Sequence, residues 1–200
     1  MCWKNWIINL IAALLLQAAL ATNAVAHGLS NQAVTIGRGG DFTLHSFGGP
    51  VSLQQFRGKV VLLFFGYTSC PDICPTTLAV LSNVFSKLNA QELERVVALF
   101  ISLDPDRDTP ELLRKYTGYF HPNIIGVTDR VEALNQITED YGVAYKREEK
   151  PDSTLGYVIN HTLDVLIVNP EGQLLDTRIR PATSTEDILA YLKKLLGSSQ

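Results

Sequence analysis

The sequence predicts an α/β fold in which a central mixed sheet is flanked by helices, and three observations lead to it. Residues 60–68 are a continuous run rich in β-branched and aromatic side chains, which is typical of a strand buried on both faces, and residues 95–104 predict a second buried strand. Each run is followed by a segment with helical apolar spacing. Further along, two apolar runs enclose residues 169–172, a turn sequence that indicates a β-hairpin.

The predicted helices have marked beginnings or a clear apolar face. The first covers residues 75–89, with Pro75 at a first helical position. The second has Asp108 or Thr109 as its N-cap and Pro110 in its first turn. The same spacing predicts two later helices, at residues 130–141 and 184–196.

The remaining segments complete the order of elements. Residues 41–59 alternate short apolar groups with glycines, which predicts a hairpin at the entry to the domain. Residues 123–128 are expected to form a third short strand, and the polar, turn-rich residues 142–157 are interpreted as a loop or lid. Two cysteines lie between the first buried strand and its helix. This order predicts a thioredoxin-like fold with an N-terminal hairpin.

The first residues have the pattern of a targeting segment. An apolar run follows Lys4 and ends in the small-residue sequence Ala24-Val25-Ala26, which predicts a cleavable secretory signal over residues 1–26. Residues 27–200 are then the folded domain, in a periplasmic or other extracytoplasmic compartment. An N-terminus that is retained would instead anchor the protein, although its apolar run is shorter than the roughly 20 residues of a bilayer span.

Composition and charge exclude few classes of function. Of the 200 residues 46% are apolar and 18% charged, which is ordinary for one globular domain. The net charge of -3, without a basic run, gives no indication of a nucleic-acid partner. A monomer is the default expectation, with membrane contact only through a partner or a retained N-terminus.

Cys70 and Cys74 form a Cys-x-x-x-Cys motif, and they are the two cysteines that remain after signal cleavage. Each precedes a proline, a position that disfavours helical angles, so we expect both on an extended loop that feeds the helix. The positive end of that helix favours a thiolate. In an oxidising compartment the pair can also close as a disulfide.

Thiolates are nucleophiles as well as metal ligands, so several interpretations stay open. The pair can brace a loop as a disulfide, act in thiol–disulfide exchange, or hold Cu(I), zinc or an iron–sulfur cluster, for which four thiolates are not available. Imidazole is a natural third ligand, and His161 precedes a predicted central strand whose loop returns beside the cysteines in a thioredoxin-like sheet. Two thiolates and one imidazole suit Cu(I) better than a closed tetrahedral zinc site.

Three segments, FFGYTSCPDICPTTL, SLDPDRDTPE and INHTLDVLIVNPEG, resemble in order the signature blocks of the Sco/SenC family of copper-binding, thioredoxin-fold assembly factors. The similarity covers residues 42–195. It implies Cu(I) and Cu(II) binding through Cys70, Cys74 and His161, and delivery to the copper A site of cytochrome c oxidase or to another copper-accepting protein. The resemblance favours a copper chaperone over an enzyme. The alternative is a thiol-disulfide oxidoreductase in which Cys70 and Cys74 reduce a partner's cysteines before copper loading.

Four further residues are candidates to support the ligands. Asp72, within the cysteine loop, can cap the helix or oppose thiolate formation. Asp104 and Asp108 resemble the family's acidic loop, and turn or cap chemistry explains them equally well. Asn160 stands where relatives often carry aspartate, which predicts altered hydrogen bonding of His161.

Overall fold

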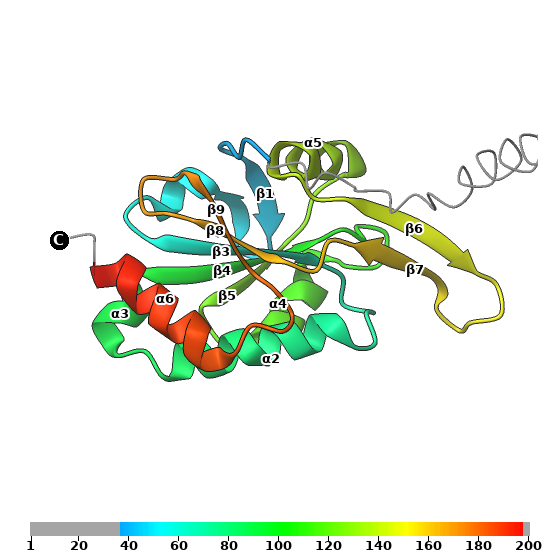
Figure 1. Ribbon diagram of the computed structural model, residues 1–200. Helices are drawn as coiled ribbons and strands as arrows, with labels where there is room; N and C mark the ends of the chain where they lie inside the picture. Colours follow the sequence, from blue (N-terminus) through cyan, green and yellow to red (C-terminus); the bar gives the residue numbers. More distant parts are fainter. Residues whose placement is uncertain (1–36, 198–200) are drawn as a thin grey trace, which may run out of the picture. The chain divides into compact units, whose positions relative to one another are not determined.

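The computed structural model describes residues 37–197, so the signal sequence expected over residues 1–26 lies outside the described residues. A five-stranded sheet with strand order β5-β4-β3-β8-β9 forms its centre (Figure 1). Three strands are parallel, and β8 and β9 each run antiparallel to the preceding neighbour. The strands are β3 (Val60–Gly66), β4 (Val96–Ser102), β5 (Ile124–Val127), β8 (Val165–Val168) and β9 (Leu174–Ile179).

Every residue of β3 and β4 is buried, as the two apolar runs predict. Side chains alternate between the faces of a strand, and accordingly Leu62 and Phe64 belong to one buried cluster while Leu63 and Phe65 belong to the other. Full burial of each such side chain stabilises the fold by about 1.5–3 kcal/mol. The centre of the sheet is therefore a rigid base for the loop that follows β3.

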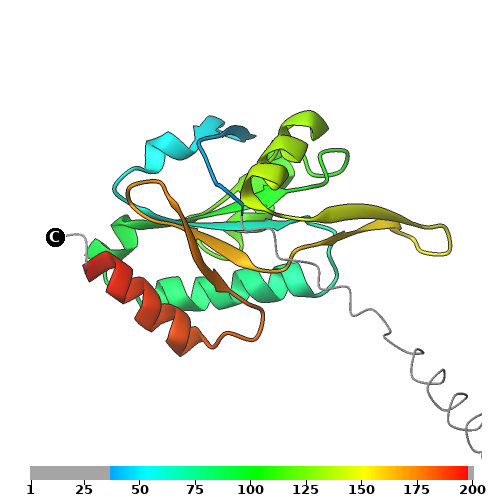
Figure 2. The same cartoon turned by 45° about the horizontal axis from the view of Figure 1, so that its top comes forward.

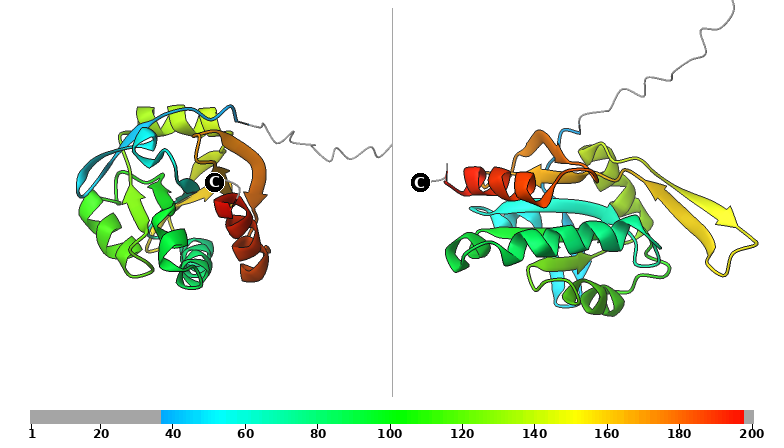
Figure 3. Two further views of the ribbon diagram at one scale, coloured as in Figure 1. Left: turned by 90° about the vertical axis from the view of Figure 1, so that its left-hand side faces the viewer. Right: turned by 60° about the horizontal axis from the view of Figure 1, so that its bottom comes forward.

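Helices cover both faces of this sheet (Figures 2 and 3). Apolar side chains of α2 (Ile73–Ser86), α4 (Pro110–Gly118) and α6 (Thr185–Gly197) pack into the cluster on one face. On the other face lie α5 (Val131–Tyr141) and an N-terminal hairpin. The mixed sheet, the flanking helices and the hairpin confirm the predicted thioredoxin-like fold.

The N-terminal hairpin consists of β1 (Thr43–Ser46) and β2 (Gly49–Ser52), and the 3-10 helix η1 (Leu53–Phe56) follows it. A short helix, α3 (Ala90–Glu94), precedes β4, and apolar spacing does not predict it. Its capping box joins Asn89 and Glu92, a three-residue signal too short for periodicity to detect. Within residues 37–197, no helix combines the length and apolar character needed to cross a bilayer.

One predicted element is wrong. The segment interpreted as a loop or lid contains β6 (Tyr145–Lys150), which pairs antiparallel with β7 (Gly156–His161). This hairpin is a separate two-stranded sheet that extends away from the main sheet in Figure 1. Every residue of β6 after its first is exposed, so the strand lacks the apolar alternation that would have revealed it.

Candidate metal centre

The two cysteines lie on either side of the point where α2 begins. Cys70 is half-buried in the loop after β3, whereas Cys74 is completely buried and is the second residue of α2. The expectation that both lie on an extended loop is therefore wrong for Cys74. The first-turn amides of a helix need no acceptor within the helix, so Pro75 fits inside that turn. Both thiols are free.

Asp72 occupies the N-cap position of α2, but its side chain makes no capping hydrogen bond. Its main-chain carbonyl accepts hydrogen bonds from the amide of Thr76 at 3.2 Å and from its hydroxyl at 2.9 Å. The carboxylate is on an exposed residue beside the cysteines. The expected side-chain cap is thus absent, and the charge of Asp72 faces solvent.

Gly66, the last residue of β3, makes room for the buried sulfur. A Cβ atom at this position would lie 2.7 Å from Cys74 Sγ and 2.8 Å from Phe100 Cε2, closer than side chains can approach. The sulfur of Cys74 therefore packs where a side chain of residue 66 would otherwise be. Sequence reasoning missed this role, although a glycine that ends an otherwise large apolar strand is a recognisable sign of close approach.

His161 completes the group from the end of β7. Its Nε2 lies 3.7 Å from Cys74 Sγ, and its ring stands edge-on to Phe64 and Tyr67 at centroid distances of 6.4 and 6.2 Å. Nδ1 is 2.8 Å from the carbonyl oxygen of Thr162, to which it donates. In the neutral ring this leaves the Nε2 lone pair directed toward the sulfur, as in metal-ligating histidines.

The other histidines within the described residues have different partners. His45 Nδ1 pairs with Asp129 at 2.8 Å. His121 Nδ1 accepts the Asn123 amide at 3.1 Å, and burial lowers the pKa of His121. The structure thus brings His161 to the cysteines, as expected from the sequence.

The two sulfurs have opposite electrostatic environments. A hydrogen bond from Cys74 lowers the pKa of Cys70 from 9.0 to about 3 against the opposing effect of burial, and His161 contributes a smaller lowering. The same hydrogen bond and burial raise the pKa of Cys74. Cys70 is therefore the thiolate at neutral pH. Cys74 keeps its proton until a metal ion displaces it.

Asp108 fixes the loop that carries Cys70. It is completely buried, and its carboxylate accepts hydrogen bonds from the Thr68 amide at 2.8 Å, the Thr68 hydroxyl at 2.5 Å and the Ser102 hydroxyl at 2.5 Å. These bonds tie the residues before Cys70 to the end of β4. Thr109, rather than Asp108, caps α4 by accepting the Leu112 amide at 3.2 Å.

Asp104 and Asn160 have partners outside the ligand group. Asp104 is 2% exposed, accepts the Tyr157 hydroxyl at 2.6 Å and pairs with Arg107. The Asn160 amide donates to Glu148 across the β6–β7 hairpin at 2.7 Å. Asn160 thus points to the exposed strand β6, and the hydrogen bond of His161 goes to the main chain instead.

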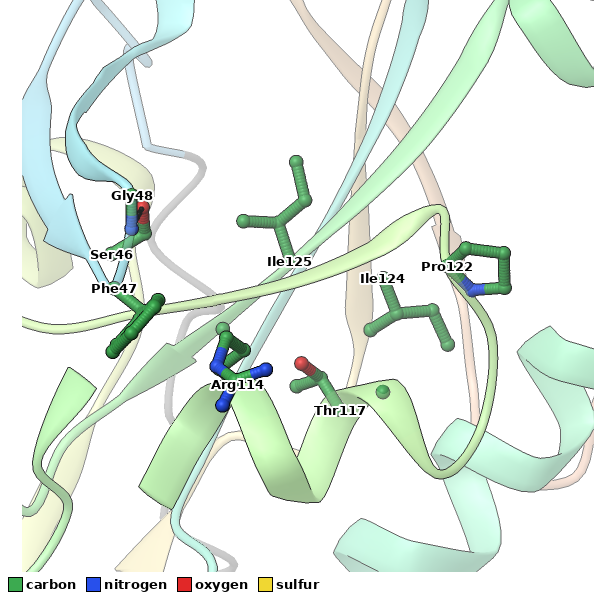
Figure 4. Close-up of a pocket in the computed structure, with 10 residues that line it drawn as sticks. Ser46, Phe47, Gly48, Arg114, Thr117, Pro122, Ile124 and Ile125 are labelled. Carbon is green, nitrogen blue, oxygen red and sulfur yellow. Dashed lines mark hydrogen bonds between the residues drawn. The ribbon is translucent and has the colours of Figure 1, made fainter. Parts of the chain in front are cut away.

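The arrangement offers soft ligands rather than a closed cage. Among residues 37–197, no set of three or more histidine, cysteine, aspartate or glutamate side chains is already assembled around a metal position. A cavity of about 240 Å³ lies between the β1–β2 turn, α4 and β5 (Figure 4), and the three candidate ligands are not among its lining residues. Cys70, Cys74 and His161 instead lie together outside that cavity, with Cys70 and His161 half-buried and Cys74 fully buried.

A thioredoxin-like sheet with a thiolate, a buried thiol and an imidazole at its first long helix defines a class of thiol proteins able to bind soft metals or exchange disulfides. The SCO1/SenC family model matches residues 31–197, and the chain belongs to this family.

Curated relatives include mitochondrial SCO2 of Saccharomyces cerevisiae, 37% identical over 145 residues, which are 71% of this chain and 48% of that protein. A SCO2-like protein of Rickettsia felis is 33% identical over 156 residues, covering 78% of this chain and 75% of the relative. The chain thus spans about half the length of the yeast protein.

Solved structures agree with this assignment. The structure of Bradyrhizobium japonicum ScoI with copper bound is 32% identical with a TM-score of 0.72, covering 80% of this chain and 99% of that one. The solution structure of apo Sco1 from Thermus thermophilus is 38% identical with a TM-score of 0.72, covering 81% and 94%.

Proposed function

We propose that this protein is a copper chaperone that binds Cu(I) through Cys70 Sγ, Cys74 Sγ and His161 Nε2. The observation that carries the proposal is the 3.7 Å approach of His161 Nε2 to Cys74 Sγ, with the imidazole proton held on the opposite nitrogen. Two sulfurs and one imidazole suit Cu(I), which accepts three-coordinate, sulfur-rich sites. The copper-bound structure of the Bradyrhizobium relative supports the choice of metal.

The proposed acceptor is the copper A site of cytochrome c oxidase, in the periplasm or a corresponding extracytoplasmic compartment. Cys70 is the accessible ligand, whereas Cys74 is completely buried. A partner's thiolate can therefore reach the metal from the Cys70 side and displace the ligands one at a time. Three-coordinate Cu(I) leaves room for such an incoming ligand, so transfer needs no free copper ion.

The test is a Cu(I) competition titration of the reduced protein, run beside Cys70→Ala and His161→Ala variants. We expect one Cu(I) per chain, with each substitution weakening binding by about tenfold or more, since the loss of one ligand leaves a two-coordinate site. The His45→Ala variant is the control, because His45 pairs with Asp129 away from the cysteines. Binding that is weak in the parent, or equal in all variants, would refute the three-ligand site.

A second candidate, a thiol-disulfide oxidoreductase, is favoured by the opposed pKa shifts of the two cysteines. The Cys70 thiolate would attack a partner's disulfide, forming a mixed disulfide and releasing one partner thiolate. Cys74 would then lose its proton and attack Cys70 Sγ, forming the Cys70–Cys74 disulfide as the second partner thiolate leaves. The partner gains the two electrons that the cysteines lose.

The role of His161 distinguishes the two functions. Reduction of a disulfide requires only the cysteines, so His161→Ala would keep most of its reductase rate. Copper binding requires the imidazole as a ligand. A variant that loses Cu(I) affinity while it still reduces a disulfide substrate would assign His161 to the metal.

A further inference from the structure

We propose that Arg107 is a positioning residue of the copper site, because it fastens the start of β7 to the loop after β4 and so holds His161 beside Cys74. The inference rests on the proposed copper function, since it concerns the share of binding that His161 supplies. Arg107 lies in the sequence SLDPDRDTPE, between Asp104 and Asp108.

The carboxylate of Asp104 joins the loop to the strand. One of its oxygens accepts from Arg107 Nε, and the other accepts the Tyr157 hydroxyl at 2.6 Å. Asp104 is 2% exposed, and its own amide donates to Ser102 Oγ at 3.1 Å. Buried hydrogen bonds to a charged group are the stronger kind, about 1.5–3 kcal/mol each, so this carboxylate is a firm attachment point.

Arg107 also contacts the main chain of the hairpin. Its Nη1 donates to the carbonyl oxygens of Leu155 at 3.1 Å and Tyr157 at 3.4 Å. The guanidinium carbon lies 3.7 Å from the centre of the Tyr157 ring and 5.7 Å from that of Tyr67. The planar guanidinium thus serves the carboxylate, two carbonyls and an aromatic face at once, a combination that lysine cannot make.

β7 transmits this attachment to the candidate ligand. Tyr157 and His161 belong to the same strand and are four residues apart, so their side chains point to the same face. Within residues 37–197 the hairpin pairs only with itself, and an isolated two-stranded sheet is marginally stable in water. In Figure 1 the end of β7 lies beside the main sheet and its start lies toward the tip of the projecting hairpin. Arg107 bonds to Leu155 and Tyr157, so it fastens the part of the hairpin that is farther from the main sheet. Arg107 therefore limits how far the imidazole can move from Cys74.

Arg147 provides a matched control on the opposite side of the same ring. Its guanidinium carbon is 3.5 Å from the centre of the Tyr157 ring. Its ion pairs go to Asp106 and Glu149, whose side chains are 69% and 68% exposed. Both arginines stack on Tyr157, but Arg107 additionally binds the buried carboxylate and the carbonyls at the start of β7.

The experiment measures Cu(I) affinity by competition in the full reduced protein and in Arg107→Met, Arg147→Met, His161→Ala and Arg107→Met/His161→Ala variants. We expect Arg107→Met to weaken binding by about tenfold, the size of effect seen when residues that orient metal ligands are removed. Arg147→Met should change it by less than about twofold, as expected of an exposed ion pair. The double variant should bind like His161→Ala, because Arg107 acts through the imidazole.

A second readout needs no copper. Hydrogen exchange of the amides in residues 156–161 of the metal-free protein should be faster in Arg107→Met and unchanged in Arg147→Met. If Arg107→Met fails to fold by circular dichroism, Tyr157→Phe takes its place, since it removes only the hydroxyl bond to Asp104; it should accelerate the same amides.

The outcomes separate two kinds of failure. Parent-like affinity and exchange in Arg107→Met, or an equal loss of affinity when His161 is already alanine, would overturn the positioning role. Copper binding by the parent that is indifferent to His161→Ala would instead overturn the proposed function. In that case the exchange rates still decide whether Arg107 fastens β7.

Discussion

Replacing Gly66 with alanine tests the packing beneath the copper site. The new Cβ would lie 2.7 Å from Cys74 Sγ and 2.8 Å from Phe100 Cε2. Carbon atoms pack at about 3.5–4.0 Å, so the sulfur and the ring must each move by roughly 1 Å, and overpacking of this kind costs about 1–3 kcal/mol. Metal binding would return the Cys74 sulfur to its original position and so restore the steric strain. A strain of about 1–3 kcal/mol corresponds to a loss of metal affinity of about 5- to 150-fold.

Gly126→Ala is the control for this prediction. Its Cβ would lie 2.8 Å from Leu113 Cβ and 3.0 Å from the Leu113 carbonyl oxygen, between β5 and α4. Urea unfolding should show comparable destabilisation of both variants, whereas Cu(I) competition should show a loss of affinity for Gly66→Ala alone. Parent-like copper affinity in Gly66→Ala, or an equal loss in both variants, would refute the argument that the glycine makes room for the sulfur.

Three further predictions concern charge. Asp108→Asn should lower the free energy of unfolding by about 3 kcal/mol in a urea titration, because it weakens buried hydrogen bonds to a carboxylate. The control Asp106→Asn, at an exposed residue, should change the free energy of unfolding by less than about 1 kcal/mol. Equal effects of the two substitutions would contradict this prediction. Because the folded pKa of Cys70, about 3, lies below the unfolded value of 9.0, the thiolate's stabilisation is complete above pH 9 and is lost as the pH falls toward 3. Iodoacetamide at pH 5 should accordingly label Cys70 and spare Cys74 by mass spectrometry, and slow labelling of Cys70 would show an ordinary thiol. At pH 7, Cu(I) binding should release about one proton, from Cys74; indicator titrations that give two or none would contradict the assigned protonation states.

Much of the fold is predictable because its signals are local. The strands β3 and β4 are apolar apart from Ser102 at the end of β4, so their burial on both faces follows from composition. The start of α4 follows from Thr109 and Pro110, since a cap and a first-turn proline act within one turn. Local sequence alone is therefore enough to predict these elements.

Two expectations, for β6 and for Cys74, are wrong for different physical reasons. β6 has the sequence YKREEK, which has no apolar face, and it is a strand because β7 pairs with it along its whole length. Cys74 is helical although a proline follows it, because the first turn of α2 tolerates that proline. The pairing of β6 cannot be read from a window of neighbouring residues, whereas the conformation of Cys74 depends on the residue at which α2 begins.

The candidate ligands could be named from the sequence because their atoms are distinctive, whereas the residues that place them could not. Gly66 matters through Cys74, eight positions further on, and Arg107 through carbonyls of residues 155 and 157. An arginine in a polar loop has many ordinary uses. Only the tertiary structure shows that this one reaches the strand that carries His161.

The Cys-x-x-x-Cys spacing has a physical consequence that follows from where α2 begins. With Ile73 as the first helical residue, Cys70 stays in the loop and half-buried, while Cys74 turns inward against Gly66. A carrier must hold copper tightly and yet release it to another protein's thiols. These demands conflict if both sulfurs have the same environment. In the proposed chaperone they are divided: the buried sulfur retains the metal, and exchange begins at Cys70, the thiolate that a partner can reach.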